Sequence, residues 1–368
     1  MKLQILQENI NSAVGIASRF ASTRAQLPVL GNVLLSAQKT KVSVCSTNLE
    51  VAVSISIGAK VEKEGEISVP AKVINEVIGN LPGGIVDLSS EKEQLKITSP
   101  NFSSTILGMD ASDFPKIPGS IGKEKAISIS RDELVKALSQ VIFAASVDET
   151  RPVLTGVLFA WEKGGLSLVA TDGFRLSQKK IKVQGGNLPK VILPKMILSE
   201  ISRSQGGDGE ILFELREKDK QAVFGLGDVV LSSRLLEGEY PDFEKILPKS
   251  SSIKVLLDKE EFLRTVKLAS VFARDSANIV KIKVLKDSVK VTAESGMAGN
   301  QEAKIDAKVE GTGDFEIAFN FRFLEEFLHS VVGEEVKMEF SGESAPGLFT
   351  DTSDSSYLHL IMPVRVQG

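Results

Sequence analysis

The chain has 368 residues, of which 42% are apolar and 25% are charged, and its formal net charge is −4. These proportions are ordinary for a globular protein, and the length allows two or three domains. Because a protein that holds nucleic acid by bulk charge is expected to be basic, the acidic balance is unfavourable to that class.

The cysteine content and the hydropathy indicate where the protein resides. Cys45 is the single cysteine, so an internal disulfide is excluded and a reducing compartment is favoured. No apolar run approaches the length that crosses a bilayer, and the first nine residues lack the pattern of a signal peptide. We therefore expect a cytoplasmic protein that has no contact with a membrane.

The chain repeats itself at a long interval. Pro28-Val29-Leu30-Gly31 reappears as Pro152-Val153-Leu154-Thr155 about 124 residues later, and Val69-Pro70-Ala71-Lys72 matches Leu193-Pro194-Lys195 at the same spacing. Repeats of about 20 to 50 residues build solenoids, whereas a unit of about 120 residues can bury its own core. We predict three similar domains, over residues 1–120, 121–250 and 251–368.

Each repeat is predicted to begin with a short strand and an amphipathic helix. Ser130 with Glu133, and Asp258 with Glu261, have the spacing of a capping box at the helix start. Apolar residues then recur at helical spacing. The strands are predicted at residues 2–6, 126–129 and 253–257, and each helix follows directly.

Hairpins and a second helix complete each repeat. Alternating segments predict paired strands, and Pro70 and Pro194 suit the start of a helix because proline has no N–H to leave unpaired. The hairpins are predicted at 33–35 with 41–45, 157–161 with 166–170, and 282–285 with 289–293. The second helices are predicted at 71–80, 195–203 and 321–332, and the last strands at 103–108, 229–235 and 357–362. This is an α+β fold, in which each domain packs two helices on antiparallel sheets.

No catalytic constellation emerges from the sequence. His329 and His359 are the two histidines, and neither has the spacing of a metal site with Cys45. Both are interpreted as structural residues. Phosphate-binding and nucleophile motifs are absent from the sequence, so we expect no enzyme activity, no metal and no cofactor.

Two segments stand out from the repeats. Asp172-Gly173 lies between alternating runs and predicts a hairpin turn. The chain end, from His359 to Arg365, is apolar and contains Met362. It is either only a last strand or an adaptable binding surface of the kind that methionine favours.

Four segments resemble one family, in order along the whole chain. Ala170-Thr171-Asp172-Gly173-Phe174-Arg175-Leu176 resembles the A-T-D-G-H-R-L segment of the bacterial β sliding clamps, the processivity subunits of DNA polymerase III. Leu27-Pro28-Val29-Leu30-Gly31-Asn32 is similar to the family's L-P-I-L-G-N. Tyr240-Pro241-Asp242-Phe243 resembles its F-P-D-Y, and Met362-Pro363-Val364-Arg365 resembles its M-P-M-R ending.

The resemblance implies a head-to-tail homodimer that closes into a ring around duplex DNA without reading its sequence. An acidic protein can then hold DNA by topology, with basic helices facing the hole. Basic residues on a helix are equally consistent with simple solvation. The candidate DNA-facing residues are Arg24, Lys72, Arg131, Lys136, Lys195 and Arg203, of which Arg24 and Lys195 match basic positions of the family.

The resemblance also implies a pocket between the second and third domains that binds short peptides. Its ligands would come from the DNA polymerase III catalytic subunit, the clamp loader, and other polymerases and repair proteins. Phe174 replaces the family's usual His, and Pro152-Val153 replaces a Tyr pair seen in some members. The matching positions are Arg151, Val153, Leu154, Thr171, Gly173, Phe174, Arg175, Leu176, Pro241, Ile246, Phe319, Phe323, Pro346, Leu360, Met362, Pro363, Val364 and Arg365.

The ring seam would join a helix end of the third domain to a strand edge of the first. Val271 and Phe272 lie at the first position and Ile106 at the second, although all three could be ordinary core residues. The favoured function is therefore a sliding clamp. The alternative is a three-domain scaffold that binds peptides without encircling DNA, and an enzyme site between domains finds no residues to support it.

Overall fold

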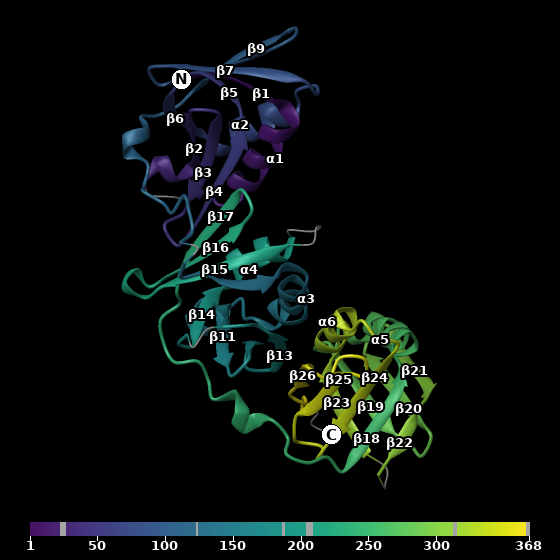
Figure 1. The fold of residues 1–368 in the computed structure, drawn as a ribbon. Helices are drawn as coiled ribbons and strands as arrows, with labels where there is room; N and C mark the ends of the chain where they lie inside the picture. The colour runs from purple at the N-terminus through teal and green to yellow at the C-terminus, as the bar shows by residue number, and fades with distance from the viewer. Residues whose placement is uncertain (23–26, 123, 186–187, 204–208, 312–314, 366–368) are drawn as a thin grey trace. The chain divides into compact units, whose positions relative to one another are not determined.

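The computed structural model describes residues 1–22, 27–122, 124–185, 188–203, 209–311 and 315–365. It divides into two compact units, Met1–Arg131 with Asp208–Leu235, and Asp132–Gly207 with Leu236–Gly368. The division does not follow the repeats, because the second repeat contributes strands to both units (Figure 1). No helix in these described ranges is long and apolar enough to span a membrane.

All three repeats have the predicted order of strand, helix, strands, second helix and a final group of strands. The first contains β1 (Lys2–Leu6), α1 (Gln7–Ser18), β2 (Asn32–Gln38), β3 (Lys41–Thr47), β4 (Val51–Gly58), β5 (Lys60–Lys63), β6 (Gly65–Pro70), α2 (Ala71–Gly79), β7 (Ile85–Glu91), β8 (Gln94–Ser99) and β9 (Phe102–Leu107). The second contains β10 (Ile127–Ser130), α3 (Arg131–Val141), β11 (Gly156–Glu162), β12 (Gly165–Thr171), β13 (Arg175–Lys182), β14 (Val191–Pro194), α4 (Lys195–Arg203), β15 (Glu210–Arg216), β16 (Gln221–Leu226) and β17 (Val229–Arg234). The third contains β18 (Ile253–Asp258), α5 (Lys259–Ala273), β19 (Ile279–Val284), β20 (Ser288–Ser295), β21 (Gly299–Asp306), β22 (Lys308–Glu310), β23 (Phe315–Asn320), α6 (Phe321–Ser330), β24 (Glu335–Phe340), β25 (Gly347–Asp351) and β26 (Tyr357–Ile361).

Local signals in the sequence account for the helix starts. The side chain of Asp258 accepts a hydrogen bond of 2.7 Å from the backbone N–H of Glu261, as the predicted cap of α5 requires. Pro194 ends β14, and α4 begins at the next residue. Ile197, Leu198 and Ile201 are buried on one face of α4, which anchors the helix to its unit.

In the first unit, one sheet crosses the boundary between two repeats. Its strand order is β10-β15-β16-β17-β4-β3-β2-β6, and β17 pairs antiparallel with β4. A second sheet has the order β5-β1-β7-β8-β9. The helices α1 and α2 pack on each other, and α1 also covers β3 and β4.

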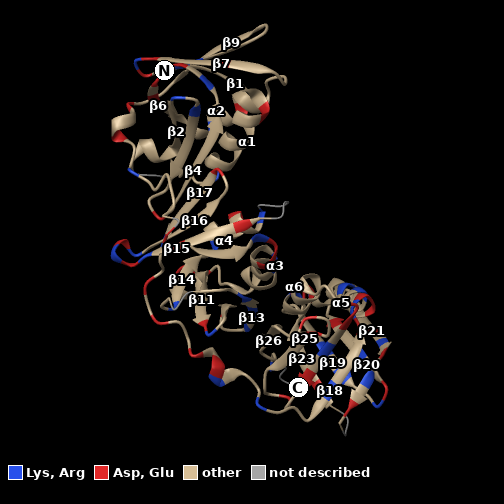
Figure 2. Cartoon of the chain, in the orientation of Figure 1, with Lys and Arg blue, Asp and Glu red and all other residues tan. Residues whose placement is uncertain are grey.

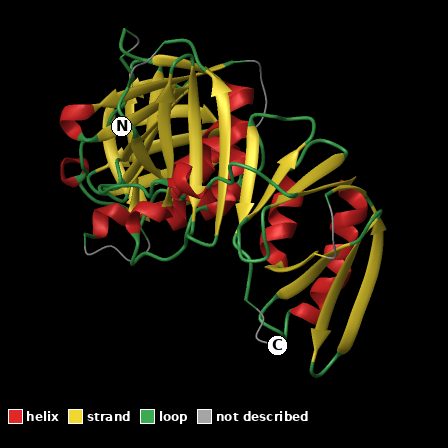
Figure 3. Cartoon of the chain, turned by 90° about the horizontal axis from the view of Figure 1, so that it is seen from below, coloured by secondary structure: helices red, strands yellow, loops and turns green. Residues whose placement is uncertain are grey.

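The second unit repeats this arrangement. Its larger sheet has the order β14-β11-β12-β13-β26-β25-β24-β18-β22, and here β26 pairs with β13. The smaller sheet has the order β21-β20-β19-β23. The helices α5 and α6 lie side by side (Figure 3), and α5 also contacts β20 and β21.

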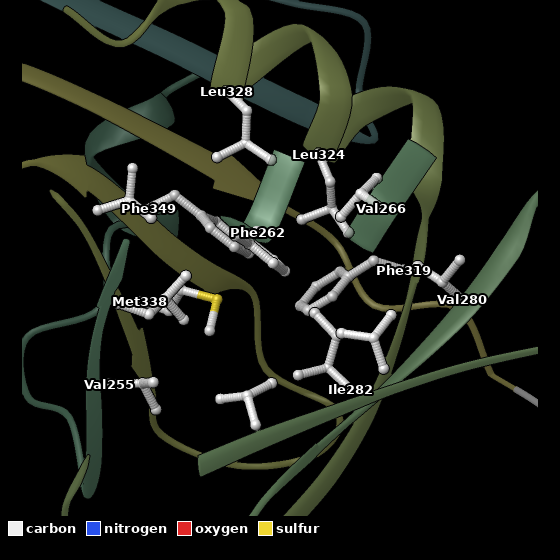
Figure 4. Close-up of a cluster of buried hydrophobic side chains, with 14 of the residues drawn as sticks. Val255, Phe262, Val266, Val280, Ile282, Phe319, Leu324, Leu328, Met338 and Phe349 are labelled. Carbon is white, nitrogen blue, oxygen red and sulfur yellow. The ribbon is translucent and has the colours of Figure 1, made fainter. Parts of the chain in front are cut away.

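The core of the third repeat is built from large apolar side chains of both sheets and both helices. Phe262 and Val266 of α5 and Leu324 of α6 meet Met338 and Phe349 of the larger sheet (Figure 4). All five are fully buried. Burial of this kind stabilises a domain by roughly 1.5–3 kcal/mol for each large side chain, so the third repeat has a substantial core of its own.

One backbone contact recurs in all three repeats and aligns them residue by residue. The amide nitrogens of Met109, Leu236 and Val364 donate hydrogen bonds of 2.8, 2.9 and 2.8 Å to the carbonyl oxygens of Ser68, Ile192 and Ala318, respectively. Each bond ties the segment after the last strand to the strand that precedes the second helix. The strands β9, β17 and β26 are therefore counterparts. The strands β4, β13 and β21 are also counterparts, because they end the equivalent orders β6-β2-β3-β4, β14-β11-β12-β13 and β23-β19-β20-β21.

Candidate functional site

The turn from Thr171 to Arg175 is confirmed as the predicted hairpin turn, and its own side chains hold it. The Thr171 hydroxyl donates to the carbonyl of Arg175 over 2.6 Å and accepts from the N–H of Gly173 over 3.1 Å. Oδ1 of Asp172 accepts from the N–H groups of Phe174 and Arg175. Gly173 has φ +93, a conformation that side chains disfavour. This rigid turn holds the Phe174 ring outward, where 61% of its surface is exposed.

The chain end runs directly past this turn. The N–H of Met362 donates to the carbonyl of Phe174 over 2.8 Å, and the N–H of Val364 then bonds to Ala318 of β23. The exposed side chains of Phe174 and Met362 are thereby brought to the same edge of the unit. Two segments that stood out in the sequence, far apart along the chain, thus form one surface.

An apolar floor lies beneath this surface. Leu176 and Leu360 belong to one buried cluster, and Val153 packs against it. Phe243 is also part of the cluster, and Tyr240 packs on it while its hydroxyl donates to the carbonyl of Val169 over 3.3 Å. Burial raises the pKa of Tyr240, so its hydroxyl remains a donor. The sequence reasoning missed Tyr240 and Phe243, although they flank Pro241 in a segment that it quoted.

A hollow of about 480 Å³ adjoins this floor. Its lining includes the apolar Leu158, Ile192, Pro241 and Phe243 together with the exposed charged residues Lys190, Glu239, Asp242 and Glu244. Concave surfaces with an apolar lining and a polar rim are typical of peptide and small-molecule sites. The volume is sufficient for one or two large apolar side chains of an extended peptide.

The other predicted pocket residues lie at different depths. Ile246 and Arg365 are exposed at the surface, as is Pro241, whereas Pro346, Pro363 and Val364 are half-buried. Arg151 is partly exposed and pairs with Asp148 over 3.1 Å. Leu154 is buried, and Phe319 lies in the interior of the third-repeat core against Phe349. Leu154 and Phe319 therefore support the site from beneath.

Arg175 is buried, although arginine side chains are mostly exposed. Its side chain is only 8% exposed, and it donates to the carbonyl of Phe143 over 2.7 Å and to Asp172 over 3.1 Å. It also pairs with Glu326 of α6 and lies 4.5 Å above the Phe323 ring. Arg175 and Phe323 thus fasten the third repeat to the second, and the guanidinium has no free face for a ligand.

A buried histidine lies close to the contacts that Arg175 makes with Phe143. His359 is fully buried between the rings of Phe143 and Phe327, each 5.4 Å away, and its Nδ1 is 2.6 Å from the Ser177 hydroxyl. Burial, together with the nearby Arg175 charge, lowers the pKa of His359 well below its ordinary value. The imidazole is therefore neutral at physiological pH. His329, in contrast, is exposed and lies 3.7 Å from Glu325.

Five of the six candidate DNA-facing residues lie on the helices α2, α3 and α4, and Figure 2 shows basic and acidic positions interspersed in both units. Lys72 is exposed on α2, and Lys195 is half-buried at the start of α4, where burial and then the Arg175 charge lower its pKa. Lys136 and Arg203 are exposed, but they pair with Asp354 and Glu200 over 3.5 Å each. Arg131 is half-buried, and Arg24 lies outside the described residues.

The candidate seam residues differ in their exposure. Ile106 is buried in β9 and Phe272 packs against the core, whereas Val271 is 56% exposed. The exposed apolar residues nearby are Leu107, at 70%, and Leu268, at 54%. Side chains alternate between the two faces of a strand, which explains why Leu107 points outward where Ile106 points inward. The sequence reasoning missed both Leu107 and Leu268.

The described residues contain no group of three or more His, Cys, Asp or Glu side chains that could hold a metal ion. The buried polar contacts found here, such as the one between Ser177 and His359, serve packing between strands.

Comparison with known proteins identifies the family. Family models of the DNA polymerase III beta subunit match residues 1–118 with the N-terminal domain, 128–242 with the central domain and 244–365 with the C-terminal domain. The chain is 32% identical to the beta sliding clamp of Staphylococcus aureus (strain Mu50 / ATCC 700699) over 356 residues, 94% of each chain. It is 31% identical to that of Synechocystis sp. over the full length of both chains.

Solved structures agree with these sequence matches. The DNA polymerase sliding clamp of Bacillus subtilis superimposes with a TM-score of 0.94 at 27% identity, over 100% of both chains. A sliding clamp of Bartonella birtlesii bound to griselimycin gives 0.94 at 29% identity, also over 100% of both chains. The resemblance and the fold class inferred from the sequence are thereby confirmed. The chain belongs to the family of bacterial beta sliding clamps, the beta subunits of DNA polymerase III, which are non-catalytic processivity factors.

Proposed function

We propose that two copies of this chain join head to tail into a ring that encloses duplex DNA and keeps the replicative polymerase on it. The repeats 1–120, 121–250 and 251–368 would be the three domains that each copy contributes. The observation that carries this proposal is the way in which consecutive repeats are joined inside one chain. The last strand of the second repeat pairs with β4, and the last strand of the third pairs with β13.

The first and the third repeat each contain one strand that lacks the equivalent pairing partner. Among the described strands, β9 ends its sheet and is the counterpart of β17 and β26, while β21 ends its sheet and is the counterpart of β4 and β13. An open strand edge is a template for pairing with another chain. The same junction, made once more between two copies, would join β9 of one copy to β21 of the next. Two such junctions close a ring if the rotation from one copy to the next brings the second copy back to the first.

The internal pairs predict the register of this junction. Leu231 lies opposite Val53, and His359 lies opposite Ser177. The corresponding residues of β9 and β21 are Ser104 and Gln301. The side-chain oxygen of Gln301 is buried without a hydrogen-bond partner in the single chain, which favours a partner at this edge. The exposed Leu107, Leu268 and Val271 would supply apolar contacts beside it.

Enclosure explains how an acidic chain can act on DNA. The net charge of −4 gives no bulk attraction to phosphates. A closed ring needs none, because topology prevents dissociation while weak contacts allow sliding. Arg24, Lys72, Arg131, Lys136, Lys195 and Arg203 are proposed to provide those contacts without reading the sequence.

The surface formed by Phe174, Met362 and the apolar floor is proposed to bind the partner peptides. Apolar side chains of an extended peptide would fill the hollow next to Tyr240 and Phe243. The DNA polymerase III catalytic subunit, the clamp loader and repair proteins would share this site in the cytoplasm. Sharing one site makes their binding mutually exclusive on each copy.

Retention on circular DNA tests the ring. The chain is loaded on nicked circular plasmid by a clamp loader and passed over a sizing column, before and after the plasmid is linearised. We expect co-elution with the circle and release from the linear form. Equal behaviour on both forms, or no retention at all, contradicts enclosure and leaves the scaffold that binds peptides alone.

A further inference from the structure

The outer face of the smaller sheet of the third repeat carries a hollow of about 180 Å³. On β19 and β20 the neighbouring Ile282 and Val291 are buried in the core of the repeat. Because side chains alternate along a strand, Lys281 and Thr292, which lie opposite each other, point away from this core. They line the hollow together with Ser276, Ile279, Ala293 and Glu294.

The register of the sheets shows which residues of the other two repeats match this hollow. Ile279 pairs with Asn320, the residue directly before α6. In the same way, Asn32 and Gly156 pair with the residues directly before α2 and α4. The strands β2, β11 and β19 can therefore be compared position by position. The pair of Lys281 with Thr292 corresponds to the pairs Leu34 with Cys45 and Leu158 with Val169.

In the first two repeats the matching position is covered by a phenylalanine from the segment after the last strand. Phe114 belongs to a buried cluster with Cys45, and Phe243 belongs to another with Val169. An aspartate directly precedes each of these phenylalanines. In the third repeat the hollow lies at this position, and its lining contains no aromatic side chain. Its volume is sufficient for one aromatic ring, because a cavity of about 150 Å³ can hold benzene.

Lysines surround the hollow on the two central strands. Lys283 and Lys290 lie directly opposite each other and on the same face as Lys281. Like charges in such positions destabilise a sheet, so strand pairing does not explain them. Lys290 pairs with Glu302 of the edge strand β21 over 2.6 Å, whereas the structure records no ion pair for Lys281 within the described ranges. The residues that match Lys283 and Lys290 are uncharged, namely Ser36 with Ser43 in the first repeat and Ala160 with Ser167 in the second.

We propose that this face binds an extended segment of a partner protein in which an acidic residue directly precedes an aromatic one. The aromatic ring fills the hollow beside Ile279 and Thr292, and the carboxylate pairs with Lys281. Lys283 and Lys290 attract further acidic residues of the segment. The segment thus has the chemistry of the Asp-Phe segments that cover the matching positions of the first two repeats. The proposal is independent of ring closure and of the peptide surface, because every residue involved belongs to the smaller sheet of the third repeat or to the turn before it.

A peptide copied from this chain provides the probe. It has the sequence of residues 236–247, which contains Asp242 and Phe243, and it carries a fluorescent label. Its binding to the full chain is measured by anisotropy. The same peptide with Phe243→Ala tests the contribution of the aromatic ring. An unlabelled peptide that carries the polymerase's clamp-binding segment is added in excess as a competitor, and a short labelled duplex is measured in parallel.

Two variants of the full chain alter the face in different ways. Lys281→Glu/Lys290→Glu reverses two charges, and Thr292→Trp fills the hollow. The control Lys254→Glu/Lys308→Glu reverses two exposed charges on the larger sheet of the same repeat. Circular dichroism checks that all three proteins are folded.

We expect both variants of the face to bind the probe about tenfold more weakly than the wild type and the control do, and we expect a similar loss for the peptide with Phe243→Ala. The competitor should not displace the probe. Displacement overturns the proposal, because the probe then occupies the peptide surface. Equal affinity of the variants and the control, or no binding to the wild type, also overturns it. If the charge variant loses affinity for the duplex alone, the face binds nucleic acid and the proposal is wrong, whatever the plasmid experiment shows about the ring.

Discussion

The amide nitrogen of Met362 donates a hydrogen bond of 2.8 Å to the carbonyl oxygen of Phe174. The first unit contains the same bond, from Arg234 to Glu50, also at 2.8 Å. The same backbone hydrogen bond thus occurs at both junctions. It joins the charged residues Arg234 and Glu50 in the first unit and the apolar residues Met362 and Phe174 in the second. This difference would explain why the proposed peptide surface lies at only one of the two junctions.

Loss of the apolar pair should weaken peptide binding. Phe174→Ala and Met362→Ala each remove an exposed apolar group from above the buried floor, and we expect each to cost about 1–2 kcal/mol of binding free energy. The measurement is anisotropy of a labelled peptide that carries the polymerase's clamp-binding segment. Val147→Ala, which removes an 88% exposed apolar side chain elsewhere in the unit, is the matched control. If neither pocket variant differs from the control, the assignment of the site is wrong.

The predicted register of the seam can be trapped by a disulfide. Ser104→Cys combined with Gln301→Cys places two thiols opposite each other on adjoining strands, where the Cα separation permits a bridge. We expect oxidation to yield a covalent dimer, seen as doubled mass on a non-reducing gel. Native Cys45 is buried and should not interfere. The pair Ser104→Cys with Lys304→Cys is shifted along the strand, and it should remain largely monomeric. Equal yields from both pairs would refute the register.

Removal of the Arg175 guanidinium should destabilise the second unit. Arg175→Ala removes the buried guanidinium from Asp172 and from the 45% exposed Glu326, and loss of its charge-assisted hydrogen bonds should cost about 1.5–3 kcal/mol. Chemical denaturation monitored by circular dichroism measures this free energy. Arg151→Ala removes a pair that is about 40% exposed, and we expect less than about 1 kcal/mol. If Arg175→Ala lowers the free energy of unfolding no more than Arg151→Ala does, the ion pairs of Arg175 contribute little to stability.

The buried His359 should make stability depend on pH. In the unfolded chain this histidine binds a proton below its ordinary pKa of 6.5, whereas burial keeps the folded form neutral. The free energy of unfolding therefore falls as the pH decreases below 6.5, by up to about 1.4 kcal/mol per pH unit. Denaturation between pH 5 and pH 7.5 measures this slope.

The comparison of slopes isolates His359 from other titrating groups. His359→Gln should flatten the dependence by up to one proton, whatever it does to stability at pH 7.5. His329→Gln alters the exposed histidine and should leave the slope unchanged. An unchanged slope in His359→Gln would mean that the imidazole is protonated in the folded chain.

Local features were predictable from the sequence because they depend on neighbours along the chain. Pro194 and the apolar spacing after it placed α4 at Lys195–Arg203, where the structure has it. The turn at Asp172-Gly173 followed equally from residue type. The pairing of β17 with β4 was not predicted, because partners so distant in sequence leave no local pattern.

The depth at which each predicted site residue lies could not be read from the sequence. Arg175 was named as a pocket residue from the resemblance alone, and nothing in the sequence indicated that Glu326 and the carbonyl of Phe143 would partner its buried guanidinium. In β9 the apolar Ile106 and Leu107 are adjacent, and the sequence does not indicate which of them faces the core. Burial depends on tertiary partners, which residue type alone does not specify.

The sheets that cross repeat boundaries have a consequence for dissecting the molecule. A fragment that contained only the first repeat would lose β17 from the side of β4, and a third repeat alone would lose β13 from the side of β26. Each fragment would then expose one strand edge, β4 or β26, that is paired in the whole chain, and such edges invite fibrous self-association. The whole chain is therefore the smallest piece suited to expression, and cutting between its repeats would replace a folded protein with an aggregating one.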